Sequence, residues 1–105
     1  MPDQDDMPVL ATIADMTAAS LERCDLPPDV LLLVRLAALV AVDATPMSYL
    51  AHVGAGIEVG VTLDDMQNVL IAIAPIVGTA RVTSGALQIA DALGIAALAL
   101  EDDDE

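Results

Sequence analysis

The 13 residues from Val30 to Val42 are apolar on nearly every side and carry one charge, Arg35. A strand is the competing interpretation of the first half of this segment, but its length and its alanines favour a helix. A helix with so few polar positions has no face suited to water, so other protein must cover it on several sides. The segment therefore predicts a packed helical protein.

Proline and capping residues mark where the other helices begin. Apolar residues recur at helical spacing from Val9 to about Arg23, and Pro27-Pro28 ends that helix because proline cannot donate to a helical ladder. Thr45-Pro46 combines an N-cap side chain with proline at the first helical position. Thr62, with Asp65 three residues later, is a variant of the capping box and predicts another helix start.

Glycines and one proline mark where helices end. The third helix is expected to stop at Gly60, because glycine readily takes the left-handed conformation beyond a helix end. In the fourth helix, Pro75 is expected to kink or end the helix, and Gly78 adds a second interruption. The fifth is expected to cover roughly Ala80–Leu93 and to close at Gly94. Since no segment shows strand alternation, the chain is predicted to be all-α with about five helices.

A chain of 105 residues is long enough to form one hydrophobic core. We expect a single helical domain over residues 9–100, a flexible acidic leader over residues 1–8 and an acidic tail over residues 101–105. The longest apolar runs fall short of the roughly 18 residues that a membrane span needs. The acidic N-terminus is unlike a signal or transit peptide. These features predict a cytoplasmic protein without a membrane partner.

The 17 acidic residues oppose only 3 basic ones, all arginine, and give a formal net charge of −14. Nucleic acids and anionic membranes both require a basic face, so the charge argues against both as partners. Yet 56% of the residues are apolar, and several helices have few polar positions to face water. A homo-oligomer with apolar interfaces is the expected solution, and a monomer with a tight alanine-rich core is the alternative.

Cys24 is the only cysteine, which excludes an intramolecular disulfide, a CxxC redox pair and a multi-cysteine zinc site. The adjacent Asp25 opposes formation of a reactive thiolate. The acidic clusters at the two ends of the chain are interpreted as solvated charge. We therefore expect no metal and no cofactor.

His52 is the only histidine, and it follows Ser48 by four residues and Thr45 by seven, so all three share one helix face. A histidine with a hydroxyl nearby can act as a general base with a proton donor or weak nucleophile. The alternatives are a satisfied core or interface histidine, and capping roles for the two hydroxyls. Arg35 is a candidate anchor for a carboxylate, or equally a member of an interface ion pair or a snorkelling side chain.

The stretch from about Leu31 to Gly94 resembles the carboxymuconolactone decarboxylase and alkylhydroperoxidase D superfamily. The resemblance is carried by the long apolar helix followed by His52, by Gly60-Val61-Thr62 with acidic residues at 64 and 65, and by Gly78 in a late apolar run. It implies an all-helical, alkylhydroperoxidase D-like subunit that assembles as a homotrimer or homohexamer, with a pocket near the subunit interfaces.

The chain departs from this family at the reactive positions. In the peroxidase branch a CxxC pair precedes the histidine by seven and four residues, where this chain has Thr45 and Ser48. Neither residue forms a thiolate, so thiol peroxidase chemistry by the CxxC mechanism is excluded. In the decarboxylase branch an acidic residue commonly stands four before the histidine, again at Ser48, and another falls near Leu33. His52 is then the remaining candidate acid/base.

Two functions are compatible with these residues. In the first, a cysteine-free pocket binds a small organic molecule, including an anionic one, and supports lyase- or isomerase-type proton transfer at His52. Ser48 and Thr45 would orient the histidine or the substrate. In the second, the protein is a non-catalytic family member that acts as a structural or interaction oligomer, with His52 hydrogen-bonded away from any cavity.

Overall fold

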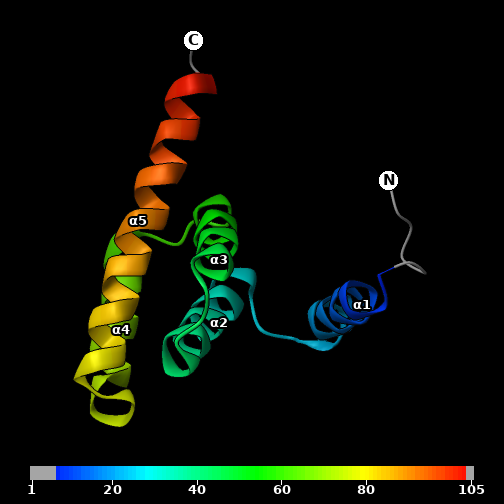
Figure 1. Ribbon diagram of the computed structural model, residues 1–105, viewed down its shortest axis with the longest axis horizontal. Coiled ribbons are helices and arrows are strands. Elements are labelled where there is room, and N and C mark those ends of the chain that lie inside the picture. The colour runs from blue at the N-terminus through cyan, green and yellow to red at the C-terminus, as the bar shows by residue number, and fades with distance from the viewer. Residues whose placement is uncertain (1–6, 104–105) are drawn as a thin grey trace.

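The computed structural model describes residues 7–103, with side chains described as far as residue 95. Within this range it contains helices and no strand, so the all-α prediction with about five helices is confirmed. Residues 1–6 of the predicted leader and residues 104–105 of the predicted tail lie outside the described residues. The helices, in chain order (Figure 1), are α1 (Pro8–Arg23), α2 (Pro28–Val42), α3 (Pro46–Glu58), α4 (Leu63–Val77) and α5 (Thr79–Asp103).

Helices α2 to α5 pack into a bundle, and α1 stands apart from it (Figure 1). Within the bundle, α2 and α5 each contact the three other helices, whereas α3 and α4 lie on either side and do not contact each other. The apolar segment predicted to need cover on several sides is therefore one of the two helices that hold the bundle together. Its cover is incomplete within one chain, because Val34 is 54% exposed and Val42 is 71% exposed.

The hydrophobic core lies where these four helices meet. Its largest fully buried side chains come from three of them and are Tyr49, Met66, Val40 and Val53. Further buried residues complete the cluster, namely Leu36, Val61, Ile89 and Ala92. This core fixes α3 between α2 and α5, and thereby positions the residues at the start of α3.

The predicted helix starts are confirmed in detail. Thr45 is the N-cap of α3, and Pro46 is its first residue. At the start of α4 the backbone N–H of Thr62 donates to Asp65 Oδ2 at 2.9 Å, and the Asp65 N–H donates to Thr62 Oγ1 at 3.1 Å. The predicted stop at Gly60 is also confirmed, since α3 ends at Glu58 and Gly60 has a φ of 93°.

Pro75 does not end its helix and Gly94 does not close α5, whereas the interruption predicted at Gly78 is confirmed. Helix α4 continues through Pro75 to Val77 and ends at Gly78, which has a φ of 97°. The hydrogen bond lost at Pro75 lies in the last turn, so the helix gives up little before it ends. Helix α5 does not close at Gly94 but continues to Asp103. A glycine in a helix interior costs only about 1 kcal/mol relative to alanine, and continuing the helix keeps the backbone hydrogen bonds.

Two glycines of α5 should respond oppositely to an added methyl group. A Cβ at Gly85 would lie 2.8 Å from Val40 Cγ2, whereas a Cβ at Gly94 meets nothing within 4 Å among the described atoms. Gly94→Ala should therefore raise the free energy of unfolding by about 0.5–1 kcal/mol. Gly85→Ala should lower it by roughly 1–3 kcal/mol. Urea denaturation measures both values, and the same sign at both positions would contradict the close contact of α2 and α5.

Tyr49 places a polar group in this core. Its side chain is 1% exposed, and its hydroxyl has no hydrogen-bond partner within the described part of the chain. Burial in this apolar surrounding raises the pKa of Tyr49 above its ordinary value of 10.0, and the carboxylate of Asp43 adds to the shift. The aromatic ring therefore stabilises the core, whereas burial of the hydroxyl costs desolvation free energy that no hydrogen bond offsets.

Tyr49→Phe should leave the free energy of unfolding unchanged or raise it by about 1 kcal/mol, because the variant removes an unpaired buried hydroxyl. The stability of the variant relative to the wild type should increase above about pH 10. There the tyrosine ionises in the unfolded state before it ionises in the folded state, so the wild type loses stability as the pH rises. Urea denaturation at neutral pH and at about pH 10.5 tests this. Tyr49 is the only tyrosine and the chain has no lysine, so few other groups titrate there. A clear loss of stability at neutral pH would show that the hydroxyl is hydrogen-bonded.

Candidate functional site

Two hydroxyl groups are held together at the start of α3. The backbone N–H of Ser48 donates to Thr45 Oγ1 at 3.4 Å, and the Thr45 hydroxyl donates to Ser48 Oγ at 3.2 Å. The first contact is the capping interaction that satisfies one of the unpaired N–H groups of a helix start. The second leaves the hydrogen of the Ser48 hydroxyl available for another acceptor.

His52 lies one turn further along α3 and is partly buried. Its Nδ1 is 2.8 Å from the main-chain oxygen of Ser48. A carbonyl oxygen can only accept, so Nδ1 carries a proton and Nε2 is the acceptor of the neutral imidazole. The helix backbone thus selects both the orientation and the tautomer of this ring.

The structure therefore brings Thr45, Ser48 and His52 together over two turns of one helix. Their connection differs from a simple pairing of histidine with hydroxyl. Ser48 contacts His52 through its main-chain oxygen, whereas its side chain is bonded to Thr45. The spacing of these residues in the sequence predicted that they share a helix face. It could not predict the contact to the main-chain oxygen of Ser48, because every residue has such an oxygen.

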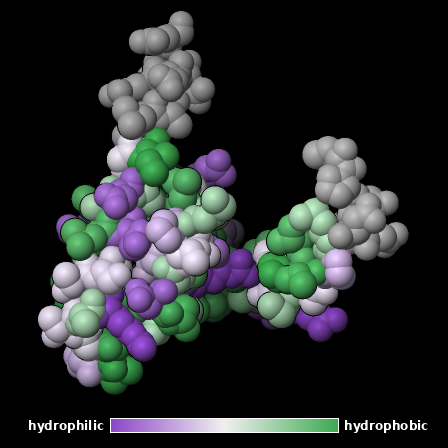
Figure 2. Space-filling view, viewed as in Figure 1, coloured by the Kyte–Doolittle hydropathy of each residue, from purple (hydrophilic) through white to green (hydrophobic). Residues whose placement is uncertain are grey.

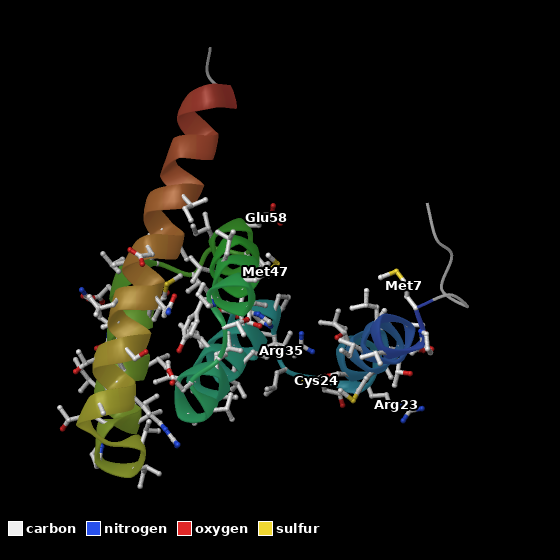
Figure 3. All side chains as sticks on the ribbon, in the orientation of Figure 1. Met7, Arg23, Cys24, Arg35, Met47 and Glu58 are labelled. Atoms are coloured by element: carbon white, nitrogen blue, oxygen red, sulfur yellow. The ribbon has the colours of Figure 1, made fainter. Side chains whose placement is uncertain are left out.

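Arg35 is directed elsewhere. Its Nη2 donates to Ser20 Oγ on α1 at 2.9 Å, and Figure 3 shows it on the side of α2 that faces α1. No hydrogen bond joins Arg35 to His52, Ser48 or Thr45 among the residues with described side chains. In the isolated chain the guanidinium thus links α1 to the bundle.

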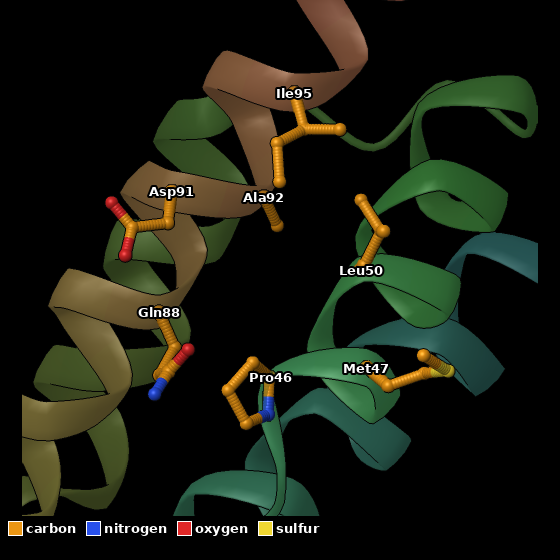
Figure 4. A pocket seen from close by; sticks show the side chains of 7 residues that line it. All are labelled: Pro46, Met47, Leu50, Gln88, Asp91, Ala92 and Ile95. Atoms are coloured by element: carbon orange, nitrogen blue, oxygen red, sulfur yellow. The ribbon is translucent and has the colours of Figure 1, made fainter.

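A cavity of about 510 Å³ opens on the other flank of α3, between α3 and α5 (Figure 4). Its wall on α3 is formed by Pro46, Met47 and Leu50, and its wall on α5 by Gln88, Asp91, Ala92 and Ile95. His52 is not among these residues. The lining is mainly apolar, and Figure 4 shows the Asp91 carboxylate turned away from α3. Sequence reasoning missed this cavity because its two walls meet only through the packing of α3 on α5, which residue spacing does not reveal. One lining residue, Ile95, also lies beyond the helix end that was predicted at Gly94.

Among the described residues, no group of three or more His, Cys, Asp and Glu side chains gathers in a way that could hold a metal ion. Cys24 lies just past the end of α1, on the linker to α2 (Figure 3), and is partly buried. None of the helices, as far as they are described, has the length and apolar character needed to cross a membrane.

The match to a known family covers Arg35, Thr45, Ser48 and His52. Residues 8–92 match the family model of the Carboxymuconolactone decarboxylase family, which is most of the chain. Comparisons with curated proteins and with solved structures returned no match. The matched range begins at the first residue of α1, so this helix is part of the family domain, whereas the resemblance seen in the residues themselves begins at about Leu31. The chain belongs to the carboxymuconolactone decarboxylase family.

Proposed function

We propose that this protein binds a small organic molecule at the start of α3 and catalyses cysteine-independent acid/base chemistry of the lyase or isomerase type. The observation that supports this proposal is the 2.8 Å contact between His52 Nδ1 and the Ser48 main-chain oxygen. It assigns the free lone pair of the neutral ring to Nε2, the atom that would accept a proton from the substrate. Thiol peroxidase chemistry is not part of the proposal, because hydroxyls stand at positions 45 and 48.

The roles of the three residues follow from their contacts. When Nε2 accepts a proton, the ring becomes a cation whose Nδ1–H remains bonded to the carbonyl dipole of Ser48, which stabilises the charge. Thr45 donates to Ser48 Oγ. The Ser48 hydroxyl can then donate its own hydrogen to a substrate oxygen that gains negative charge. Arg35 would anchor a substrate carboxylate only through guanidinium donors that Ser20 does not use.

A non-catalytic role is the second candidate. The observation that favours it is the position of the 510 Å³ cavity, which is lined by the opposite flank of α3 and not by His52. In this case His52 stabilises α3 through its bond to the helix backbone, and the protein acts as a structural or interaction oligomer.

Assembly and location belong to the same proposal. Large apolar side chains on the outside of the bundle, including Ile71 at 70% exposure and Ile76 at 88%, support a homo-oligomer, which the family resemblance implies to be a homotrimer or homohexamer. The net charge of −14 supports a protein without nucleic acid or anionic membrane as partner. A cytoplasmic location agrees with these features.

Carboxymuconolactone, the compound in the family name, is the probe for the catalytic proposal. His52→Asn places an amide near the position of Nδ1, which can still donate to Ser48, but removes Nε2. It should lower the rate of carbon dioxide release by roughly 10²–10⁴-fold. Ser48→Ala removes only the hydroxyl donor and should have a smaller effect. Gln88→Ala, in the wall of the α3–α5 cavity, is the matched control and should leave the rate unchanged.

The same measurements distinguish the two candidate functions. Full activity of the His52→Asn variant would overturn the catalytic role of His52. Loss of activity in the Gln88→Ala variant, with activity retained in the other variants, would indicate that the reaction takes place in the α3–α5 cavity. A wild-type protein that neither turns over nor binds the lactone, as measured by calorimetry, would favour the non-catalytic role.

A further inference from the structure

Helix α1 presents an apolar face that the described part of its own chain contacts by a hydrogen bond only where Arg35 donates to Ser20, two turns beyond Ile13. None of its 16 residues is buried. The large apolar side chains on this face are all at least half exposed, namely Val9 at 70%, Leu10 at 55%, Ile13 at 50%, Met16 at 66% and Leu21 at 51%. Figure 2 shows apolar surface gathered on this separate part of the molecule. A lone helix of this length is marginally stable in water, so α1 requires packing against another surface.

The linker between α1 and α2 keeps α1 away from its own bundle. Cys24 has an extended backbone with ψ of 126°, and Pro27 has φ of −55° and ψ of 150°. Two prolines in succession at Pro27-Pro28 hold the preceding residues in extended conformations. Among the described residues, the hydrogen bond from Arg35 to Ser20 is the only one that joins α1 to the bundle. The linker therefore favours an arm that projects from the bundle (Figure 1).

A groove between α2 and α4 offers a matching surface. It has a volume of about 230 Å³, and every side chain that lines it is apolar. Its walls include Val30, Leu33 and Val34 on α2 and Val69, Ala72 and Ile73 on α4. On α2 this is the side that the chain leaves partly uncovered, since Val34 is 54% exposed. The groove begins at Val30, the third residue of α2, which places it beside the point where α1 leaves the bundle.

Charge decides what kind of partner fits these two surfaces. A chain with a net charge of −14 repels a copy of itself wherever carboxylates meet. Asp15 and Glu22 lie on the side of α1 opposite to Ile13, and the groove has no charged residue in its lining. Contact between the apolar face and the groove therefore brings no carboxylates together. The arm and the groove are also present in equal numbers in any assembly of this chain.

We propose that α1 of one copy packs by this apolar face into the α2–α4 groove of a second copy, and that the exchange is reciprocal. Each apolar side chain of the arm buries on the order of 100 Å². Two arms and the two grooves that they cover bury on the order of 2,000 Å² in total, the size of a stable interface. A reciprocal exchange has two-fold symmetry. It therefore fits an even number of subunits, such as a hexamer, rather than a trimer alone.

Charge substitutions test the contact in the full-length protein. Ile13→Asp places a carboxylate on the apolar face and should weaken self-association at least about 100-fold, measured by sedimentation equilibrium. Ala18→Asp adds the same charge on the opposite side of α1, where the residue is exposed, and should leave the mass unchanged. The Ala72→Lys protein, which carries a charge in the groove, should by itself be dissociated. When it is mixed with the Ile13→Asp protein, the two variants should form a mixed assembly. A monomeric wild type, or an Ile13→Asp protein of unchanged mass, would overturn the proposal.

Cysteine pairing gives a second test that does not depend on folding of charged variants. In a Cys24→Ser background, a chain carrying Ile13→Cys is mixed with a chain carrying Ala72→Cys and oxidised. The expected product is a covalent dimer of the two different chains. Ala18→Cys, paired with the same Ala72→Cys chain, should give much less of it. Equal yields from both pairs, or a disulfide formed within a single chain that carries both cysteines, would overturn the exchange. This readout is separate from catalytic activity, so it stands or fails independently of the role of His52.

Discussion

The contact between α2 and α5 at Val40 and Gly85 is the constraint on which the rest of the bundle depends. Val40 is fully buried, and the missing side chain at Gly85 allows the two helices to approach so closely that a Cβ would lie 2.8 Å from Val40 Cγ2. The Tyr49 hydroxyl lies beside the same glycine, 3.4 Å from the position of that Cβ. The close approach of α2 and α5 thus also sets how α3 sits between them, because Tyr49 anchors α3 in the core.

Once Tyr49 and Val53 face the core, helical geometry determines what the two flanks of α3 present. One flank carries Ser48 and His52, and the other carries Leu50 as part of the α3–α5 cavity. The two candidate functions therefore correspond to two sides of one rigidly held helix. A ligand on either side would rest on the same core, which explains why fold alone does not choose between them.

The sequence predicted the parts of the structure that depend on local chemistry. Helix starts at Thr45 and Thr62 were predictable because a cap is a contact between residues two or three apart. Pro75, which was expected to kink or end its helix, does not end it, and Gly94 does not end α5. Each of these residues only weakens a helix, and whether the helix stops there depends on the packing of the next turn. The α3–α5 cavity was hidden because its walls are brought together by tertiary packing, and the error at Gly94 removed only Ile95 from the predicted helix. The partner of Arg35 was equally hidden, because Ser20 meets it through tertiary structure.

Arg35 lies between α1, which is proposed to bind a second copy, and the bundle that holds the candidate site. It lies on the helix that contacts α3, and it is bonded to the arm through Ser20. A guanidinium has five N–H donors, so one bond to a serine leaves others for a carboxylate on a ligand or on a neighbouring chain. An arm seated on a second copy would fix the position of Ser20 and, through it, the position of Arg35.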